Sequence, residues 1–365
     1  MTRAMHRYLT LTLEGDPYTM GWQHGRQVRE LRPLIVQAME ARFTQLEQDG
    51  PDARFETLLR ETRGLLEASA SPLLAMIRGQ ADALDVEFET LLRYALVSFL
   101  RDDLVIRRAT GAQGCTTWAA AGSATADGRP MLVKNRDYLP EHLPLQVVVR
   151  ATPEVGYRYL YVSSAGSPGV FCAGINQVGL AVADTHVYSA DLGPGLPSYA
   201  LMMQLLEAHD SLPSALDYLR ATPRLGRNNL ILADGQGRLA VFESGNRRYG
   251  LFESSDGVLV NTNHFVSAEM RPCFVEIDPP DARGRSFGRY EKTMAELEAA
   301  FGQVDVAFAQ RLMASHDGPL ASLCCHPEAN SFASTISASI LLPVQRQMLF
   351  CHGQPCQGYY DEFSL

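Results

Sequence analysis

The stretch GCTTWAAAGSATADGRPMLVKNRDY, residues 114 to 138, carries the strongest fold signal in this chain. The residues that follow Cys115 form a short strand candidate, and Asp127-Gly128 is a turn pair typical of β-hairpins. The chain then runs back as a second strand candidate that reaches Asp137. The stretch therefore predicts an antiparallel hairpin with a thiol and a carboxyl group close together at its open end.

The pattern of apolar residues changes at Cys115. Before it, apolar residues recur at helical spacing and strand signals are nearly absent. The two helical series are Val28, Leu31, Ile35 and Met39, and Phe55, Leu58, Thr62 and Leu65. After Cys115, strand candidates follow one another, and helical periodicity interrupts them at residues 197 to 220 and 286 to 312. The strand candidates beyond the hairpin are residues 145 to 151, 158 to 163, 168 to 186, 229 to 233, 238 to 243, 249 to 253, 258 to 264, 334 to 342 and 346 to 352.

This order of elements predicts an α+β protein. Two groups of strands, with helices before, between and after them, favour stacked antiparallel sheets whose outer faces are covered by helices. At 365 residues the chain is long enough to bury a large core, and no repeat or low-complexity linker divides it. We therefore expect residues 1 to 114 and 115 to 365 to form one domain together.

Composition and charge limit the classes of partner. The chain has 46% hydrophobic and 20% charged residues, and its net charge is -9, with 32 Lys and Arg scattered among 41 Asp and Glu. Because there is no basic stripe, we expect no nucleic-acid partner. No apolar run approaches the roughly 18 residues of a membrane span, and the N-terminus lacks the apolar core of a secretory signal. We expect no membrane association and a cytoplasmic location.

Cys115 has the sequence context of a nucleophile. Seven cysteines are an odd number and too sparse for a disulfide framework, so reduced thiols are expected. Gly114 leaves the preceding carbonyl carbon unshielded, so the thiol can attack it, shift the acyl group from nitrogen to sulfur and let water release it. The freed α-amino group has an unperturbed pKa of about 7.7 to 8.0, so it can accept the thiol proton near neutrality. We predict cleavage between Gly114 and Cys115, with Asp137 orienting the amine and Asn263 donating a hydrogen bond to the oxyanion.

The motifs GCTTW, TADGRPML and NRDY resemble the isopenicillin N acyltransferase family of autoproteolytic N-terminal nucleophile (Ntn) hydrolases. The similarity extends over nearly the whole chain. The other similar segments are residues 15 to 28, 88 to 99, 174 to 186 and 259 to 265, and the terminal STISASILLPVQRQMLFCHGQPC. The resemblance implies a four-layer αββα fold, a precursor processed into an α chain (1 to 114) and a β chain (115 to 365), and Cys115 as nucleophile supported by Asp137 and Asn263. No cofactor is expected.

The length of the segment before the cysteine favours this family over a related one. Choloylglycine hydrolases share the same cysteine, aspartate and asparagine, but their mature chain begins close to the translated start. Here 114 residues precede the cysteine. We therefore expect an acyl-thioester at Cys115 and transfer of the acyl group of a small-molecule donor to an amine or to water.

Two further residues are candidates for the pocket or the oxyanion hole. His186 stands near the end of a predicted strand, and Ser331 is followed by Phe332 where the penicillin-forming fungal enzyme of the family has serine and arginine. Because an apolar side chain cannot pair with a substrate carboxylate, we expect an amine or acyl partner other than the penicillin one. We assign packing roles to His24 and His264.

The alternative hypothesis is a noncatalytic binding protein of the same fold that uses a C-terminal Cys/His cluster for metal or thiol chemistry. That cluster is Cys324, Cys325, His326, Cys351, His352 and Cys356. Adjacent cysteines do not fit the standard spacing of zinc ligands. Cys351 and His352 are neighbours on a predicted strand, so their side chains point to opposite faces. We therefore expect no metal site, and the intact Gly114, Cys115 and Asp137 favour the enzyme.

Overall fold

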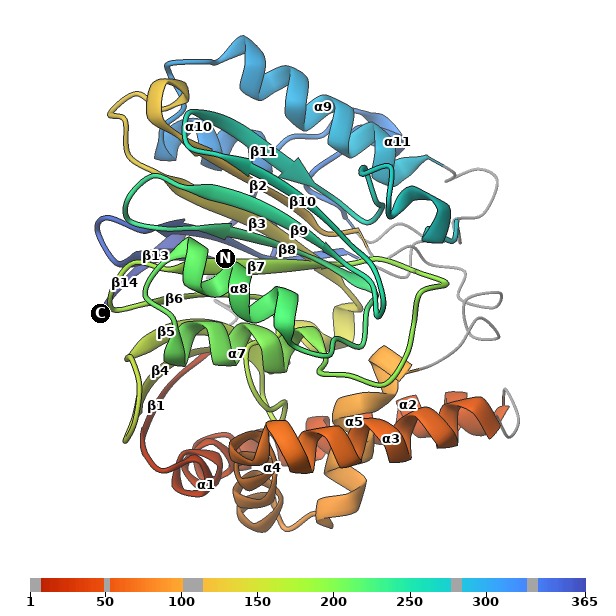
Figure 1. The fold of residues 1–365 in the computed structure, drawn as a ribbon. Helices are drawn as coiled ribbons and strands as arrows, with labels where there is room; N and C mark the ends of the chain where they lie inside the picture. The colour runs from red at the N-terminus through yellow and green to blue at the C-terminus, as the bar shows by residue number, and fades with distance from the viewer. Residues whose placement is uncertain (1–7, 49–52, 101–113, 277–283, 327–333) are drawn as a thin grey trace.

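The computed structural model describes residues 8 to 48, 53 to 100, 114 to 276, 284 to 326 and 334 to 365. Within these ranges two β-sheets lie face to face, and helices cover the outer face of each (Figure 1). Helices α9 (Arg285–Ala299), α10 (Val306–Met313) and α11 (Gly318–Ala321) lie on the side of one sheet. Helices α7 (Ser198–Ala208) and α8 (Leu212–Ala221) lie on the side of the other. The fold is therefore the predicted four-layer αββα arrangement.

The smaller sheet contains the predicted hairpin. Its six strands are all antiparallel to their neighbours within the described residues. In spatial order they are β11 (Gly257–Asn261), β2 (Thr116–Ala121), β3 (Met131–Tyr138), β12 (Ser334–Leu342), β13 (Gln347–His352) and β14 (Tyr360–Ser364). In the hairpin, Thr116 pairs with Asn135 and Ala120 with Met131, which confirms the prediction. β14 is an edge strand that the sequence analysis did not identify.

The larger sheet has eight strands. In spatial order they are β1 (Leu9–Gly15), β4 (Gln146–Pro153), β5 (Tyr159–Ser164), β6 (Ala173–Asn176), β7 (Ala181–His186), β8 (Asn228–Ala233), β9 (Leu239–Ser244) and β10 (Tyr249–Ser254). The first pair, β1 with β4, is parallel and the other pairs are antiparallel. The expectation that strand signals are nearly absent before Cys115 is wrong at β1. Its alternating Leu9, Leu11 and Leu13 are the period-two signal that was missed.

The N-terminal helices pack together below the larger sheet (Figure 1). They are α1 (Pro17–Gln27), α2 (Arg32–Gln48), α3 (Ala53–Ser69), α4 (Ser71–Leu84) and α5 (Phe88–Leu100). Helices α1 and α4 cross so closely that a Cβ atom on Gly21 would lie 2.0 Å from the carbonyl oxygen of Met76. Short 3₁₀ helices are Arg29–Leu31, Gly122–Ala124, Pro140–Leu145 and Arg271–Cys273. His24 in α1 is buried and accepts a hydrogen bond from the main-chain N–H of Gly166, so it joins this helical layer to the loop after β5.

Small side chains let the two sheets approach each other. Ala119, Ala121 and Leu132 of the hairpin pack against apolar residues of the larger sheet such as Val148 and Ile231. Because side chains alternate along a strand, Trp118 points the other way, and its ring lies 6.4 Å from that of Phe308 in α10. The hairpin is therefore packed on both faces.

Two segments that were each predicted as a single helix are divided by a turn. Residues 197 to 220 form two helices, and the second begins at Leu212 with Pro213 in its first turn. Residues 286 to 312 also form two helices, separated by a turn in which Gly302 has a φ of +80°. Within the residues that the structure describes, no helix is both long and apolar enough to cross a membrane.

Candidate active site

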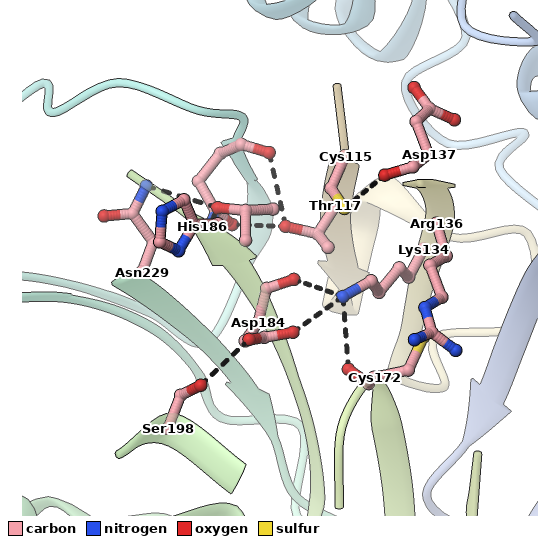
Figure 2. A network of polar contacts seen from close by, with 12 residues as sticks. Cys115, Thr117, Lys134, Arg136, Asp137, Cys172, Asp184, His186, Ser198 and Asn229 are labelled. Carbon is pink, nitrogen blue, oxygen red and sulfur yellow. Dashed lines mark hydrogen bonds and ion pairs between the residues drawn. The ribbon is translucent and has the colours of Figure 1, made fainter. Parts of the chain in front are cut away.

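The open end of the β2–β3 hairpin brings Cys115 and Asp137 together (Figure 2). Cys115 directly precedes β2, and Asp137 lies one residue before the end of β3. The Cys115 Sγ atom is 3.9 Å from the main-chain carbonyl oxygen of Asp137, to which the thiol donates a weak hydrogen bond. Both side chains are buried. The local turn of the hairpin is therefore enough to bring the thiol to the main chain of Asp137, whose carboxyl group points away from the sulfur in Figure 2.

The Cys115 thiol is protonated in the uncut chain. Burial raises its pKa to about 11, because a thiolate would lose its hydration in this environment. The positive charge of Lys134 lowers the pKa, and the carboxylates of Asp137 and Asp184 raise it. Attack by sulfur at neutral pH therefore requires a group that accepts the thiol proton.

The carboxyl group of Asp137 is satisfied on one oxygen only. Its Oδ1 atom accepts a hydrogen bond of 2.6 Å from the Thr335 hydroxyl, whereas its buried Oδ2 atom has no hydrogen-bond partner among the described residues. Burial raises the pKa of Asp137 to about 6, against the lowering effect of the Arg289 charge. A Cβ atom added to Gly114 would lie 3.0 Å from Oδ2. The unpaired oxygen therefore faces the peptide that precedes Cys115.

Arg289 connects the cysteine to Asn263. It lies on α9, is 1% exposed, and donates from Nη1 to the main-chain carbonyl oxygen of Cys115 (2.6 Å) and to the Thr116 hydroxyl (2.8 Å). Its Nη2 donates to Asn263 Oδ1 at 2.8 Å. The Asn263 amide nitrogen donates in turn to the main-chain oxygen of His186 at 2.8 Å. Since Oδ1 faces the guanidinium, the amide is held in one orientation, with one of its two N–H groups not used by His186.

Lys134 is a second buried cation that sequence reasoning missed. Its side chain is 2% exposed and forms an ion pair with Asp184 at 2.7 Å, and Asp184 also accepts a hydrogen bond from Ser198 (Figure 2). Burial by itself would lower the pKa of Lys134, but the nearby Asp184 carboxylate and the Cys172 and Cys115 thiols raise it overall. A lysine directly after the apolar run Met131 to Val133, within a strand, was the available signal. Arg289 gave none, because an arginine on an amphipathic helix usually lies at the surface.

The remaining predicted site residues have different positions. The ring of His186 packs edge-on against Tyr188 with ring centroids 4.8 Å apart, and burial lowers its pKa to about 3, so it is neutral. Its main-chain oxygen, not its ring, contacts Asn263. His264 stacks on Phe287 and bonds through Nδ1 to the Ser286 hydroxyl, which fits a packing role. Ser331 lies outside the described residues.

With this geometry in place, the chain can be compared with known proteins. Residues 123 to 357 match the model of the acyl-coenzyme A:6-aminopenicillanic acid acyl-transferase family. The chain belongs to this family. The matched range begins after Cys115, so family membership identifies the fold and the general chemistry of the relatives but does not itself cover the cysteine.

A relative from Archaeoglobus fulgidus, an uncharacterized protein, is 24% identical over 353 residues. That match covers 84% of this chain but only 57% of the relative, so the chain spans little more than half of that protein's length. Among solved structures, a mutant conjugated bile acid hydrolase from Clostridium perfringens has a TM-score of 0.50 at 12% identity, with 69% of this chain and 92% of that chain covered. A penicillin V acylase from Agrobacterium tumefaciens has a TM-score of 0.43 at 15% identity, with 65% and 83% covered. The bile acid hydrolase supports the family's fold for this chain.

Proposed function

We propose that this member of the acyl-transferase family is a self-processing cysteine Ntn enzyme that forms an acyl-thioester at Cys115 and transfers the acyl group to an amine or to water. The observation that carries the proposal is the convergence at one buried point of the Cys115 thiol, the half-satisfied Asp137 carboxyl group and the Asn263 amide held by Arg289. Separate elements of the chain contribute these groups, and together they have the chemistry of acyl transfer.

The first reaction is cleavage of the peptide bond between Gly114 and Cys115. The ionised Asp137 carboxylate, next to this peptide, accepts the thiol proton as sulfur adds to the carbonyl carbon of Gly114. Collapse of the tetrahedral intermediate breaks the C–N bond, the nitrogen takes up a proton, and a thioester links Gly114 to Sγ. Water then hydrolyses the thioester, which yields a carboxyl group at Gly114 and a free thiol and α-amino group at Cys115.

The unpaired Oδ2 atom of Asp137 acquires a partner through this cleavage. Before cleavage it faces an amide that carries no charge. Afterwards an ammonium or amine at Cys115 lies in the same place, and a positive charge there favours the ionised carboxylate. Asp137 is then suited to hold the amine in the orientation from which it accepts the thiol proton in each turnover.

During turnover, sulfur attacks the carbonyl carbon of the acyl donor while the α-amino group takes the proton. The Asn263 N–H that does not bind His186 can donate to the developing oxyanion, and Arg289 prevents the amide from rotating its oxygen into that position. The leaving group departs with the proton, and an amine or a water molecule then attacks the thioester. We propose a small acylated molecule as donor, other than the penicillin precursor, because Phe332 follows Ser331.

The segment before the cleavage point should remain bound after processing as an α chain, residues 1 to 114, on a β chain, residues 115 to 365. β1 supplies an edge strand that pairs with β4 over seven residues, and Leu11 and Leu13 are fully buried. If this segment left, the apolar residues of the larger sheet that now pack against it would be exposed to water. The two chains therefore form one αββα domain.

Intact-mass measurement of freshly purified protein tests the proposal directly. We expect two masses, for residues 1 to 114 and 115 to 365, and one acyl adduct on Cys115 after exposure to a panel of acyl-coenzyme A, acyl-amino acid and β-lactam compounds. An uncut chain that no compound acylates would favour the noncatalytic alternative. Native size exclusion should keep both chains in one peak.

A further inference from the structure

A group of sulfur and imidazole ligands assembles away from Cys115. It consists of His316, Cys324, His326 and Cys356, whose ligand atoms all lie within 4.8 Å of one another. The C-terminal Cys/His residues of the sequence form a larger set, in which adjacent cysteines argue against a metal. The structure separates that set: the Cys325 thiol lies near the Ser322 carbonyl oxygen and the Asp137 carboxyl group, and Cys351 is fully buried in β13. His316, which no sequence pattern singled out, joins instead.

The distances among Cys324, His326 and Cys356 are close to those of a tetrahedral zinc site. With zinc bonds of about 2.3 Å to sulfur and 2.0 to 2.1 Å to nitrogen, a regular tetrahedron separates its ligand atoms by about 3.3 to 3.8 Å. The Sγ atoms of Cys324 and Cys356 are 3.6 Å apart. His326 Nε2 is 3.8 Å from Cys324 Sγ and 3.1 Å from Cys356 Sγ. The exposed His316 ring lies 4.9 Å from the His326 ring, and its nearest ligand atom is within 4.8 Å of the other three, so it is placed to supply the fourth ligand.

The backbone that carries His316 and Cys324 is held by hydrogen bonds that need no metal. The main-chain N–H groups of Leu323 and Cys324 both donate to the carbonyl oxygen of Ser315, which holds the His316 and Cys324 segments together. The Asn135 side chain on β3 donates to the carbonyl oxygens of Met313 and Leu323 at 2.8 and 2.7 Å, so it fixes both ends of the same loop. A prearranged backbone lowers the entropic cost of collecting four ligands.

We propose that His316, Cys324, His326 and Cys356 bind one zinc ion in a closed, four-coordinate structural site. Two thiolates and two imidazoles in tetrahedral arrangement are a ligand set typical of zinc, and four protein ligands leave no position open for substrate. The ion cross-links the loop after α10, the loop after α11 and the turn between β13 and β14. It adds a fixed point to a part of the chain where two of the four side chains are exposed.

Hydrogen bonds connect the proposed zinc site to Asp137 through Cys325 and Thr335. The Cys325 N–H donates to the Thr335 hydroxyl at 2.8 Å, and that hydroxyl donates to Asp137 Oδ1 at 2.6 Å. Cys325 lies between the two ligands Cys324 and His326, so the metal fixes the position from which Thr335 is held. Zinc therefore acts as a positioning element for Asp137, a role that rests on the proposed function, whereas the metal site itself does not.

Metal content is the primary test. The full-length protein is purified in the presence of a phosphine reductant from zinc-supplemented cells, exchanged into metal-free buffer and analysed by inductively coupled plasma mass spectrometry. We expect one zinc ion per chain, and substitution by cobalt(II) should give the d–d absorption of a tetrahedral site with thiolate ligands. Wild-type protein that holds no zinc after incubation with excess zinc chloride would overturn the proposal.

Variants assign the ligands. Cys356→Ala and His316→Ala remove exposed side chains, so the fold should persist, and each should lower zinc affinity by more than the roughly 10- to 100-fold that outer-shell substitutions cost. Gln357→Ala, next to Cys356 in the same exposed turn, is the matched control and should bind zinc as the wild type does. Unchanged zinc affinity in both ligand variants, or an equal loss in the control, would refute the assignment.

Thiol titration of protein purified without reductant separates the zinc site from a disulfide. The denatured, zinc-stripped chain should show all seven cysteines as free thiols. A zinc-free chain with two fewer thiols and a Cys324–Cys356 cross-link in its peptide map would instead overturn the proposal.

The rate of self-cleavage tests whether zinc positions Asp137. Cys356→Ala should slow self-cleavage while Gln357→Ala should not. Equal cleavage rates with zinc lost from Cys356→Ala would remove the link to Asp137 and leave the metal site intact.

Discussion

Cys115 and Cys324 are both buried thiols, but their neighbours suit them for opposite tasks. Cys115 has a carboxyl group, an amide and two buried cations around it, and among the described residues its sulfur contacts one weak acceptor. Cys324 has a second thiol and an imidazole within 4 Å. One sulfur among charged groups that can move its proton is suited to reaction, whereas paired sulfur and nitrogen donors are suited to binding a metal.

The two regions also differ in how the chain assembles them. The pair Cys115 and Asp137 comes from one hairpin whose turn lies ten residues or so from each, so a local signal is sufficient to bring them together. His316, Cys324 and Cys356 come from three separate segments that meet only after the sheet, α10 and α11 have packed. The proposed reactive centre is therefore visible in a contiguous motif, whereas the proposed metal site, which is made from loops, is not.

The largest expected effect separates the two thiols by function. Cys115→Ala should abolish self-cleavage and turnover completely, because no nucleophile remains, and leave zinc binding unchanged. Cys356→Ala should still cleave itself, although more slowly than the wild type, and should lose zinc. The test measures the intact mass and the zinc content of each of the two variants. Recovery of fragments 1 to 114 and 115 to 365 from Cys115→Ala in a protease-free preparation would break the comparison.

The next effect concerns Asp137, which the proposal places in both reactions. Asp137→Asn keeps the shape and the hydrogen bond from Thr335 but removes the charge that accepts the thiol proton and later holds the amine. We expect self-cleavage and turnover both to fall by about 10²-fold or more, the upper part of the range for a positioned acid or base. The measurement is the time course of cleavage by intact mass, beside initial rates on one accepted substrate. Normal cleavage with normal turnover would exclude Asp137 from the mechanism.

The third prediction is a substitution that lowers turnover much more than it lowers the final extent of self-cleavage. Asn263→Ala removes an oxyanion donor, a loss that typically lowers kcat by about 10²- to 10³-fold. Cleavage happens once and has hours to finish, so this variant should become substantially processed while its activity is very low. His264→Gln, beside it and outside the proposed reaction, is the control and should keep most activity. Wild-type turnover by fully processed Asn263→Ala would shift the oxyanion role to main-chain amides.

The smallest effect is the pH dependence of self-cleavage. Burial raises the pKa of Asp137 to about 6, so below that pH the carboxyl group is protonated and cannot accept the thiol proton. The cleavage rate should fall about tenfold per pH unit below 6 and level off above it. In Asp137→Asn this break should disappear. A wild-type rate that keeps rising tenfold per unit towards the thiol pKa of about 11 would indicate direct attack by thiolate instead.

The sequence alone determined the hairpin, the pairing of Cys115 with Asp137 and the layered α+β fold. These features depend on alternation, turn residues and helical periodicity, which are properties of short segments. Even so, β1 was missed because a single short strand before five helices is weak against the helical pattern around it. The long helical segments divided at Pro213 and Gly302, where local chemistry was present but was given too little weight.

Only the tertiary structure decided which distant side chains meet at each centre. Arg289 reaches Cys115 and Asn263 because α9 packs across the ends of β2 and β11, and Lys134 meets Asp184 because the two sheets stack in one register. His316 joins Cys356, which lies 40 positions further along the chain, for the same kind of reason. A contact between neighbours in a hairpin is set by one turn, whereas a contact between remote segments depends on the packing of whole elements, which no local pattern encodes.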